Sequence, residues 1–448
     1  MFSRRGFVRL GAATVGSLAL RPFGLLPALA QSSTPDYRAL VCIFLFGGND
    51  SNNTVLPMDD ASFNAYTTIR GPLALTSADL TSTLTTVSGN PVAFHAKLAE
   101  LASLFSSKEL AVVANVGSLV QPLTRALYQA QQAPVPANLF SHSDQQLQWQ
   151  TSIAQGSSPT GWAGRAADYI ATQGYNSPAF PSFLSVAGNS MLGTGAQTQP
   201  VELTPGQSLQ LKGFNSSAES QARWNAMNNL LTLDTGISLA QAANDTLAAT
   251  VADATALGTA LSKAPALKTV FPKTSIAQQL QQVAQIIQVQ STLGMRRQIF
   301  FCSLGGFDTH TNELNTHNNL YPQISPAIAA FYEATQELGM AQNVTTFTES
   351  DFSRTLQPTS GDGSDHAWGS HHLVLGGAVQ GGQVFGQFPT FALGGPDDAD
   401  TRGRWIPTTS IDQYGATLCA WFGIPQSALS TVFPNLPNFS TGKLGFLG

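Results

Sequence analysis

Continuous runs of apolar residues predict four strands, at positions 39–46, 110–116, 298–304 and 344–348. A run that is apolar throughout, rather than at every second position, is typical of a strand buried on both faces of a parallel sheet. Between these runs, apolar residues recur at helical spacing. The alternation of strands and helices predicts a three-layer α/β/α fold with a mostly parallel central sheet.

Six helices of this fold are predicted from apolar residues three and four positions apart or from a residue that starts a helix. They lie at 93–105 and begin near Ser141, Gly161, Ser275, Ser325 and Ser410. The Ser325 helix is expected to end at Gly339, and Ser410 with Gln413 has the spacing of a capping box.

The stretch 188–265 differs in composition from the rest of the chain. It is rich in Ala, Thr, Asn, Ser and Gln, with helices expected around 217–232 and 238–261. We interpret it as a helical cap inserted into the α/β core. The predicted divisions are a signal peptide at 1–30, the N-terminal part of the core at 31–187, the helical insertion at 188–265 and the C-terminal part of the core at 266–448.

The N-terminus has the features of a twin-arginine export signal. Arg4 and Arg5, followed by Phe7, precede an apolar run and a small-x-small cleavage site at 28–30. An uncleaved membrane anchor is the alternative, but the Arg-Pro pair at 21–22 leaves too few uninterrupted apolar residues to span a bilayer. We therefore expect the twin-arginine translocase to export the chain to the periplasm or the medium, with no stable membrane insertion.

Composition narrows the choice of partners. Charged residues are 10% of the chain, well below the usual quarter. Cleavage after residue 30 removes four arginines and no acidic residue, so 21 basic residues become 17 against 26 acidic ones, a net charge of about −9. This argues against nucleic acid as a partner. Of the three cysteines, Cys42 and Cys302 lie in predicted strands, which indicates buried thiols rather than disulfides.

Histidines and carboxylates are concentrated in one region. Five of the seven histidines lie between His310 and His372. Asp50, Asp308 and Asp351 each follow a predicted strand, and parallel strands end at the same edge of a sheet. Asp and Gly are also ordinary turn formers, but three aspartates at one edge favour a metal centre, because imidazole nitrogen and carboxylate oxygen are its usual ligands.

The helix start near residue 141 is a candidate for nucleophilic chemistry. A serine at a helix N-terminus faces free backbone N–H groups, which suits an anionic substrate. Ser141 is the first candidate nucleophile and Ser143 the second. The simpler alternative is that Ser141 only caps the helix.

Five motifs carry a resemblance to known proteins. They are Phe46-Gly47-Gly48-Asn49-Asp50 with Asn53, Ser141-His142, Gly305 to His310, Ser350-Asp351-Phe352 with Arg354-Thr355, and Asp365-His366 followed by Trp368-Gly369 and His371-His372. On these motifs the chain resembles the twin-arginine-exported bacterial family catalogued as domain of unknown function number fifteen-oh-one. That family in turn resembles the alkaline phosphatase and sulfatase superfamily, which implies an alkaline-phosphatase-like fold.

The resemblance implies two divalent ions, zinc first, with manganese or calcium as alternatives. The candidate metal ligands are Asp50, Asp308, His310, Glu349, Asp351, Asp365, His366, His371 and His372. Ser141 would be the nucleophile, and His142 or Arg354 would stabilise the transferring oxyanion. Glu349 and His372 could instead support a ligand from behind.

Three functions follow as hypotheses, of which the last is a carbohydrate-binding protein without a metal. The first is an exported metal-dependent hydrolase of phosphate or sulfate esters, acting on a small-molecule or polymeric substrate. The second is an exported, non-catalytic binding or assembly protein on the same fold, whose metal is structural or lost.

Overall fold

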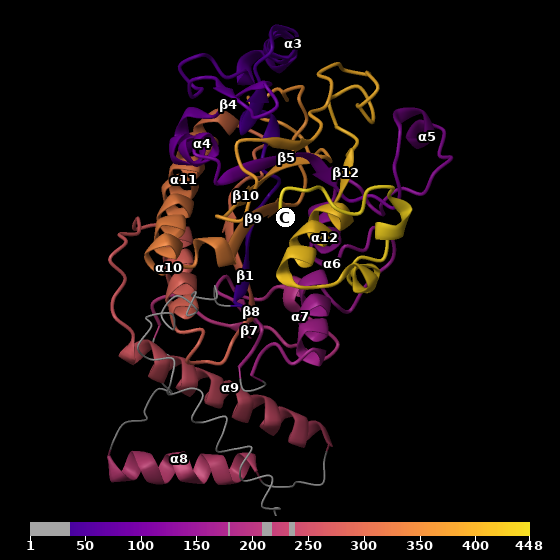
Figure 1. Ribbon diagram of the computed structural model, residues 1–448. Helices are drawn as coiled ribbons and strands as arrows, with labels where there is room; N and C mark the ends of the chain where they lie inside the picture. The colour runs from indigo at the N-terminus through magenta and orange to yellow at the C-terminus, as the bar shows by residue number, and fades with distance from the viewer. Residues whose placement is uncertain (1–35, 178–179, 208–216, 233–237) are drawn as a thin grey trace, which may run out of the picture. The chain divides into compact units, whose positions relative to one another are not determined.

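The four apolar runs form four strands of one sheet in the computed structural model (Figure 1). They are β1 (Arg38–Phe46), β5 (Leu110–Gly117), β8 (Arg297–Gly305) and β9 (Val344–Ser350). β1 pairs in parallel with both β8 and β9, and its interior residues are buried. Three of the apolar runs, β9, β1 and β8, are therefore the centre of the sheet, and β5 is an interior strand nearer one edge.

Five shorter strands complete the sheet. They are β6 (Phe183–Ser185), β7 (Val201–Glu202), β10 (Ser370–Leu375), β11 (Val384–Gly386) and β12 (Thr409–Ser410). The order is β11-β5-β10-β9-β1-β8-β6-β7, with β12 beside β5. β10 runs antiparallel to both of its neighbours, and every other pairing is parallel.

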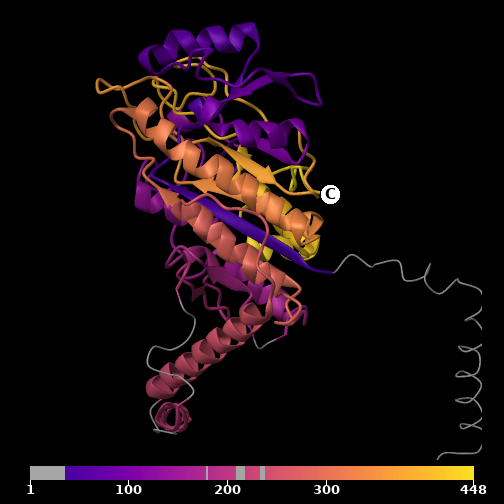
Figure 2. The ribbon, with the colours of Figure 1, turned by 90° about the vertical axis from the view of Figure 1, so that its left-hand side faces the viewer.

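Helices cover both faces of the sheet. On one face lie α4 (Ala99–Ser106), α10 (Ser275–Gln288) and α11 (Glu313–Glu337), and on the other lie α6 (His142–Thr151), α7 (Trp162–Thr172), α12 (Ile411–Phe422) and α13 (Leu429–Val432) (Figures 1 and 2). The predicted three-layer α/β/α class with a mostly parallel sheet is confirmed. The Ser410–Gln413 capping box at the start of α12 is also confirmed.

The structure describes residues 36–177, 180–207, 217–232 and 238–448. The expected signal peptide at 1–30 lies outside these ranges. Residues from Arg38 onward form one compact unit, and the fold described is that of this unit. No helix of the described residues is long and apolar enough to cross a membrane.

Two helices lie within the stretch expected to be an insertion. They are α8 (Ala218–Leu231) and α9 (Ser238–Lys263), which contact each other. The same stretch also contains β7, which is an edge strand of the central sheet. The division of the chain at 188 and 265 stays a prediction.

Two of the remaining helices, α3 (Asp60–Arg70) and α5 (Arg125–Gln129), were not expected from the sequence. A small antiparallel sheet of β2 (Val55–Pro57), β3 (Leu84–Thr85) and β4 (Pro91–Phe94) was not expected either. The helix predicted at 93–105 is therefore wrong in its first part. Val92 to Phe94 are buried in strand β4, and the helical spacing of the leucines is realised only from Ala99.

The helix predicted from Ser325 begins twelve residues earlier, at Glu313. Pro322 and Pro326 lie inside it, although a proline in this position normally marks a helix start. α11 packs on α10 and α4, and residues before Pro326 such as Tyr321 and Ile324 are buried, which offsets the hydrogen bonds that the prolines cannot donate. The Ser275 helix is capped one residue earlier than expected, by Thr274.

Candidate metal centre

An aspartate follows each of the three central strands β9, β1 and β8. These are Asp351, Asp50 and Asp308, and they emerge at the same edge because the strands are parallel neighbours. Gly47, after β1, has a φ of 111°, and a Cβ there would lie 2.5 Å from the backbone nitrogen of Asp308. Glycine at this position therefore lets the loop after β8 pack directly on the loop after β1.

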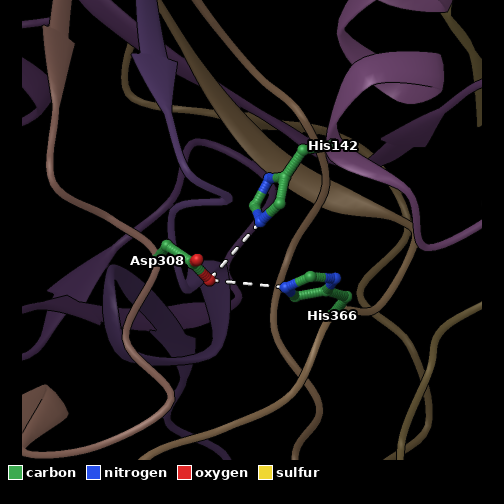
Figure 3. Close-up of side chains that lie close together, drawn as sticks. All are labelled: His142, Asp308 and His366. Atoms are coloured by element: carbon green, nitrogen blue, oxygen red, sulfur yellow. Dashed lines mark hydrogen bonds and ion pairs between the residues drawn. The ribbon is translucent and has the colours of Figure 1, made fainter.

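Asp308 lies at the centre of three histidines, two of which are shown with it in Figure 3. Its Oδ1 atom lies 3.4 Å from Nε2 of His142, 3.3 Å from Nε2 of His366 and 3.2 Å from Nε2 of His310. The Nε2 atoms of His310 and His366 are 2.9 Å apart. We call these four residues the outer cluster. They come from the first residue of α6, the loop after β8 and the loop between β9 and β10.

Each of the three histidines points its other ring nitrogen, Nδ1, at an oxygen that can accept a hydrogen bond from it. The pairs are His142 with Oδ2 of Asp351 at 2.6 Å, His366 with the carbonyl oxygen of Phe140 at 2.8 Å, and His310 with Oδ1 of Asp365 at 3.3 Å. An acceptor at Nδ1 keeps the proton there and leaves the Nε2 lone pair available. Three lone pairs then face one carboxylate, which is repulsive unless a cation lies among them.

Burial and charge keep His366 neutral and Asp308 ionised. Burial lowers the pKa of His366, which keeps the ring neutral. Burial opposes ionisation of Asp308, but the hydrogen bond and charge of Arg354, whose Nη2 lies 2.6 Å from Oδ1, outweigh burial and lower the carboxyl pKa. The hydrogen bond to Asp351 raises the pKa of His142, so a proton would compete with a metal ion for its Nε2.

Arg354 is wholly buried beneath Asp308. Besides Asp308, its guanidinium donates to the carbonyl oxygens of Gly48, Phe307 and Ser364. All three of its nitrogens therefore bind protein oxygens. This geometry makes Arg354 a group that positions and ionises Asp308, rather than one that faces a substrate.

The donor set fits a divalent metal ion. Imidazole nitrogen and carboxylate oxygen are typical zinc ligands, and ligands 2.0–2.1 Å from zinc in a tetrahedron lie about 3.3 Å from one another. Asp308 Oδ1 is 3.2–3.4 Å from the three nitrogens. His142, Asp308 and His366 offer ligand atoms that all lie within 4.8 Å of each other. Nε2 of His142 is buried and has no hydrogen-bond partner, as expected of an atom arranged for a cation.

The outer cluster is accessible from solvent. The side chains of Asp308 and His310 are 48% and 46% exposed, whereas those of His142 and His366 are 29% and 23% exposed. Structural zinc sites are closed by protein ligands, whereas catalytic sites keep a position open. With His142, Asp308 and His366 as its three protein ligands, an ion here would keep a fourth position open for a ligand from solution.

Asp50 does not join the outer cluster. It is wholly buried, and its carboxylate contacts Arg70, which also contacts Glu313. Glu313 and His317, on the first turns of α11, lie close enough to Asp50 to share a metal ion. Burial raises the pKa of Asp50 to about 8, against the opposing charge of Arg70, which lowers it. We call these four residues the buried cluster.

The other acidic candidates lie in different surroundings. Asp351 and Asp365 support the ring nitrogens of His142 and His310 from behind, rather than facing the Nε2 atoms. Glu349 is on β9 and points into the hydrophobic core, where burial raises its pKa to about 8. The structure therefore places Glu349 away from the outer cluster.

His371 and His372 are also away from the outer cluster. They are adjacent, buried residues of β10, at an irregularity in its pairing with β5. Nδ1 of His371 accepts from the backbone N–H of Asn115, and the His372 ring packs on Trp149. Burial lowers their pKa values to about 4 and about 3, so both are neutral core residues at neutral pH.

Ser141 precedes the first residue of α6, but its hydroxyl serves the helix itself. Its Oγ lies 2.6 Å from Oδ2 of Asp144, to which it donates, and 3.1 Å from the hydroxyl of Ser143. The hydroxyl is therefore bound to the exposed first turn of α6. Its role as a nucleophile stays a prediction.

Several residues that belong to the two clusters, or that contact their members or the acids behind them, were not singled out from the sequence. They are Arg70, Phe140, Gln146, Glu313, His317 and Arg402. His142 with Gln146 and Glu313 with His317 are each four residues apart on a helix, a spacing that places both side chains on one face. Arg70 and the Phe140 carbonyl have no comparable sequence pattern, because their role depends on how distant segments pack.

Several solved structures are similar to the chain, at low identity. They include the lipoteichoic acid synthase LtaP of Listeria monocytogenes (7% identity, 84% of this chain and 75% of that chain, TM-score 0.32). Two others are the zinc complex of the C-terminal periplasmic domain of EcEptC of Escherichia coli (12%, 77% and 74%, 0.28) and the phosphonate monoester hydrolase of Agrobacterium radiobacter (9%, 87% and 74%, 0.33). At these TM-scores the similarity carries no argument about function.

The chain matches a protein family over most of its length, although it matches no individual curated protein. No curated protein matches the chain. One family matches residues 37–401, which include every member of the outer and buried clusters. The chain belongs to this family, described as "Protein of unknown function (DUF1501)".

Proposed function

We propose that this protein binds a divalent metal ion at the outer cluster and hydrolyses phosphate or sulfate esters there. One observation carries the proposal. Three Nε2 lone pairs converge on an ionised, solvent-accessible carboxylate, and a hydrogen-bond acceptor behind each imidazole holds it in place. His142, Asp308 and His366 would hold the ion, with His310 on the more exposed side. Zinc suits this donor set best, and manganese or calcium are the alternatives.

The residues have separate tasks in this proposal. A bound ion would supply a Lewis acid that polarises an ester oxygen. Asp351 and the Phe140 carbonyl hold the protons of His142 and His366 on Nδ1, and Arg354 keeps Asp308 ionised. Because the Ser141 hydroxyl donates to Asp144, we propose that water, rather than Ser141, attacks the ester.

We further propose that the twin-arginine translocase exports the folded chain, and that it acts in the periplasm or outside the cell. Support comes from the paired arginines Arg4 and Arg5 and from the cleavage site at 28–30. The expected substrate is a small-molecule or polymeric ester. The net charge of about −9 after cleavage argues against nucleic acid as the substrate.

A second candidate function is an exported binding or assembly protein without catalysis, whose metal is structural or lost. The observation that favours it is again the hydrogen bond from Ser141 to Asp144, which directs the nearest candidate nucleophile into its own helix. The hydrolase would turn over an ester, whereas the binding protein would not.

The test uses the chain from residue 31 onward, purified without a metal-affinity tag. Metal content is measured by elemental analysis, and hydrolysis of aryl phosphates and aryl sulfates is assayed before chelation, after chelation and after adding back zinc, manganese or calcium. We expect a bound ion and a turnover that chelation removes and the ion restores. His366→Ala should lose both. Asp362→Asn, an exposed carboxylate in the same loop, should keep both.

Two results would contradict the hydrolase. A chain that contains no ion and takes up none excludes the proposed site. A chain that binds an ion, loses it in His366→Ala, and yet turns over neither class of ester favours the non-catalytic function.

A further inference from the structure

We infer that Arg70 occupies the place of a second cation in the buried cluster, so that this cluster takes up no metal ion while Arg70 is present. Asp50, Glu313 and His317 have the ligand types of a metal site, are wholly buried, and offer atoms within 4.8 Å of each other. The superfamily resemblance implies two ions, with Asp50 as a ligand. The residues around Asp50 do not fit that expectation, because the cation position is already filled.

Arg70 bridges the two carboxylates with a single nitrogen. Its Nη2 contacts both Oδ2 of Asp50 and Oε1 of Glu313. Its Nη1 donates to the carbonyl oxygens of Thr355 and Leu356, at 2.7 and 3.0 Å, which fixes the guanidinium in place. Arginine stays protonated in proteins, and two positive charges a few ångströms apart repel strongly where water is excluded. A divalent ion between these carboxylates would have to displace Arg70.

The other carboxylate oxygens are also occupied. Oδ1 of Asp50 accepts from the backbone N–H and the side-chain amide of Asn52, at 3.1 and 2.9 Å. Oε2 of Glu313 accepts from the hydroxyls of Thr309 and Ser364. Both carboxylates thus have complete partners without an ion.

His317 differs from the two carboxylates. It is wholly buried, and neither of its ring nitrogens has a hydrogen-bond partner. An imidazole in this state can bind a cation as soon as one enters. Removal of the Arg70 charge should therefore turn Asp50, Glu313 and His317 into a metal site.

The buried cluster also supports the outer cluster. Thr309, which donates to Glu313, lies between Asp308 and His310, and Ser364, which donates to the same oxygen, lies two residues before His366. Arg70 thus fixes, through Glu313, the loops that carry three outer residues. The whole chain should bind one divalent ion rather than two. The expected count of one ion rests on the proposed function, whereas the inference that the buried cluster takes up no ion does not.

The experiment measures Zn²⁺ binding by native mass spectrometry and calorimetry in the chain from residue 31 onward. His310→Ala combined with His366→Ala removes the outer site and reports the buried cluster alone. We expect this double variant to bind no zinc. Adding Arg70→Ala should create one zinc equivalent, which His317→Ala or Glu313→Gln then removes. Arg70→Lys, which keeps the positive charge, should create none.

The outcomes separate this inference from the proposed function. A double variant that still binds one zinc, lost in Glu313→Gln or His317→Ala, overturns the inference. So does a folded Arg70→Ala chain that gains no zinc. If Arg70→Ala does not fold, the double variant decides alone, since no zinc supports the inference and one zinc at these residues overturns it. If the unmodified chain binds no zinc but the Arg70→Ala chain gains one, the proposed function fails and the inference stands.

Discussion

Glu349 and Asp351 are only two residues apart, but their carboxylates lie in different surroundings. Asp351 lies just past the end of β9 and reaches the sheet edge, where its carboxylate binds His142. Glu349 is the last residue but one of β9, and its carboxylate lies in the core, with Oε2 3.7 Å from Sγ of Cys42. Burial raises the pKa of Glu349 to about 8, so it is a neutral core residue at pH 7.

Glu349→Gln should therefore change the pH dependence of stability. The folded-state pKa of about 8 lies above the usual 4.5, so the contribution of neutral Glu349 is complete below pH 4.5 and is lost as pH rises through 8. Glutamine stays neutral throughout. The stability of the variant relative to the unmodified chain should rise from pH 5 to pH 8, by at most about 1.4 kcal/mol per pH unit. Denaturant unfolding at several pH values measures it.

Glu333→Gln is the control for this experiment. Glu333 is exposed on α11, so its loss should leave the pH dependence as it is. Parallel curves for Glu349→Gln and the unmodified chain would mean that Glu349 is ionised in the folded protein.

Ser141 gives a second prediction for single residues. Its hydroxyl donates to Asp144, an exposed carboxylate whose pKa is lowered by the side-chain hydrogen bonds of Asn138 and Ser141, which makes it a weak base. Ser141→Ala should therefore reduce kcat by less than about tenfold, as should the control Ser143→Ala, whereas removal of a true nucleophile costs on the order of a millionfold. Steady-state hydrolysis of an aryl phosphate decides. A loss above a thousandfold confined to Ser141→Ala would identify it as the nucleophile.

Among the elements, helix α6 connects the outer cluster to the sheet. His142 and Gln146, one turn apart, both reach Oδ2 of Asp351, at 2.6 and 2.7 Å. The other oxygen, Oδ1, accepts from the backbone N–H of Gly47 at 3.1 Å. Asp351 thus joins the start of α6, the end of β9 and the loop after β1, and it orients the His142 ring.

Asp351→Asn should weaken metal binding without changing the fold. The amide has one acceptor oxygen in place of two, so it cannot serve Gly47 and His142 together, and the His142 ring loses its orientation. Loss of such a supporting carboxylate typically lowers metal affinity about 10- to 100-fold. Titration with Zn²⁺ against a competing chelator measures this. Asp362→Asn makes the same change of charge at an exposed position and should bind zinc as the unmodified chain does. Equal zinc affinity of the two variants would mean that Asp351 does not contribute to metal binding.

The elements also show what the sequence can predict. Strands β1, β5, β8 and β9 were predicted to within three residues at either end, because a short, continuous apolar run bounded by turn residues is typical of a buried strand. The start of α11 was missed, because prolines normally end or begin a helix and only its packing on α10 and α4 accounts for the two inside it. β10 was missed because two histidines within an otherwise ordinary strand resemble a catalytic loop.

The candidate site was predictable in its place but not in its pairing. Three aspartates at strand ends and the sheet edge that they share follow from the parallel strands. The parallel strands do not determine which aspartate faces the histidines. The pairing of Asp50 depends on Arg70 of α3, and nothing in the spacing of the sequence brings that helix to the end of β1.

On the scale of the whole molecule, the outer cluster joins segments that are far apart in the chain. His142 comes from α6, Asp308 and His310 follow β8, and His366 precedes β10. An ion at this point would add bonds between these three segments in the folded state only. Because the unfolded chain has no such arrangement, the binding free energy of the ion adds to the stability of the fold.

Removal of the ion should therefore lower the Tm of the whole chain. At a free ion concentration one hundred times the Kd, binding stabilises the folded state by about 2.7 kcal/mol. For a chain of this size that corresponds to roughly 3–5 °C, since each kcal/mol shifts Tm less as a protein grows. Calorimetry of the purified chain with and without a chelator measures the difference. His366→Ala should melt at the same temperature in both conditions, because without this metal ligand it binds no ion for the chelator to remove. An unmodified chain whose Tm does not respond to the chelator, while its bound metal is removed, would show that the ion does not join these segments.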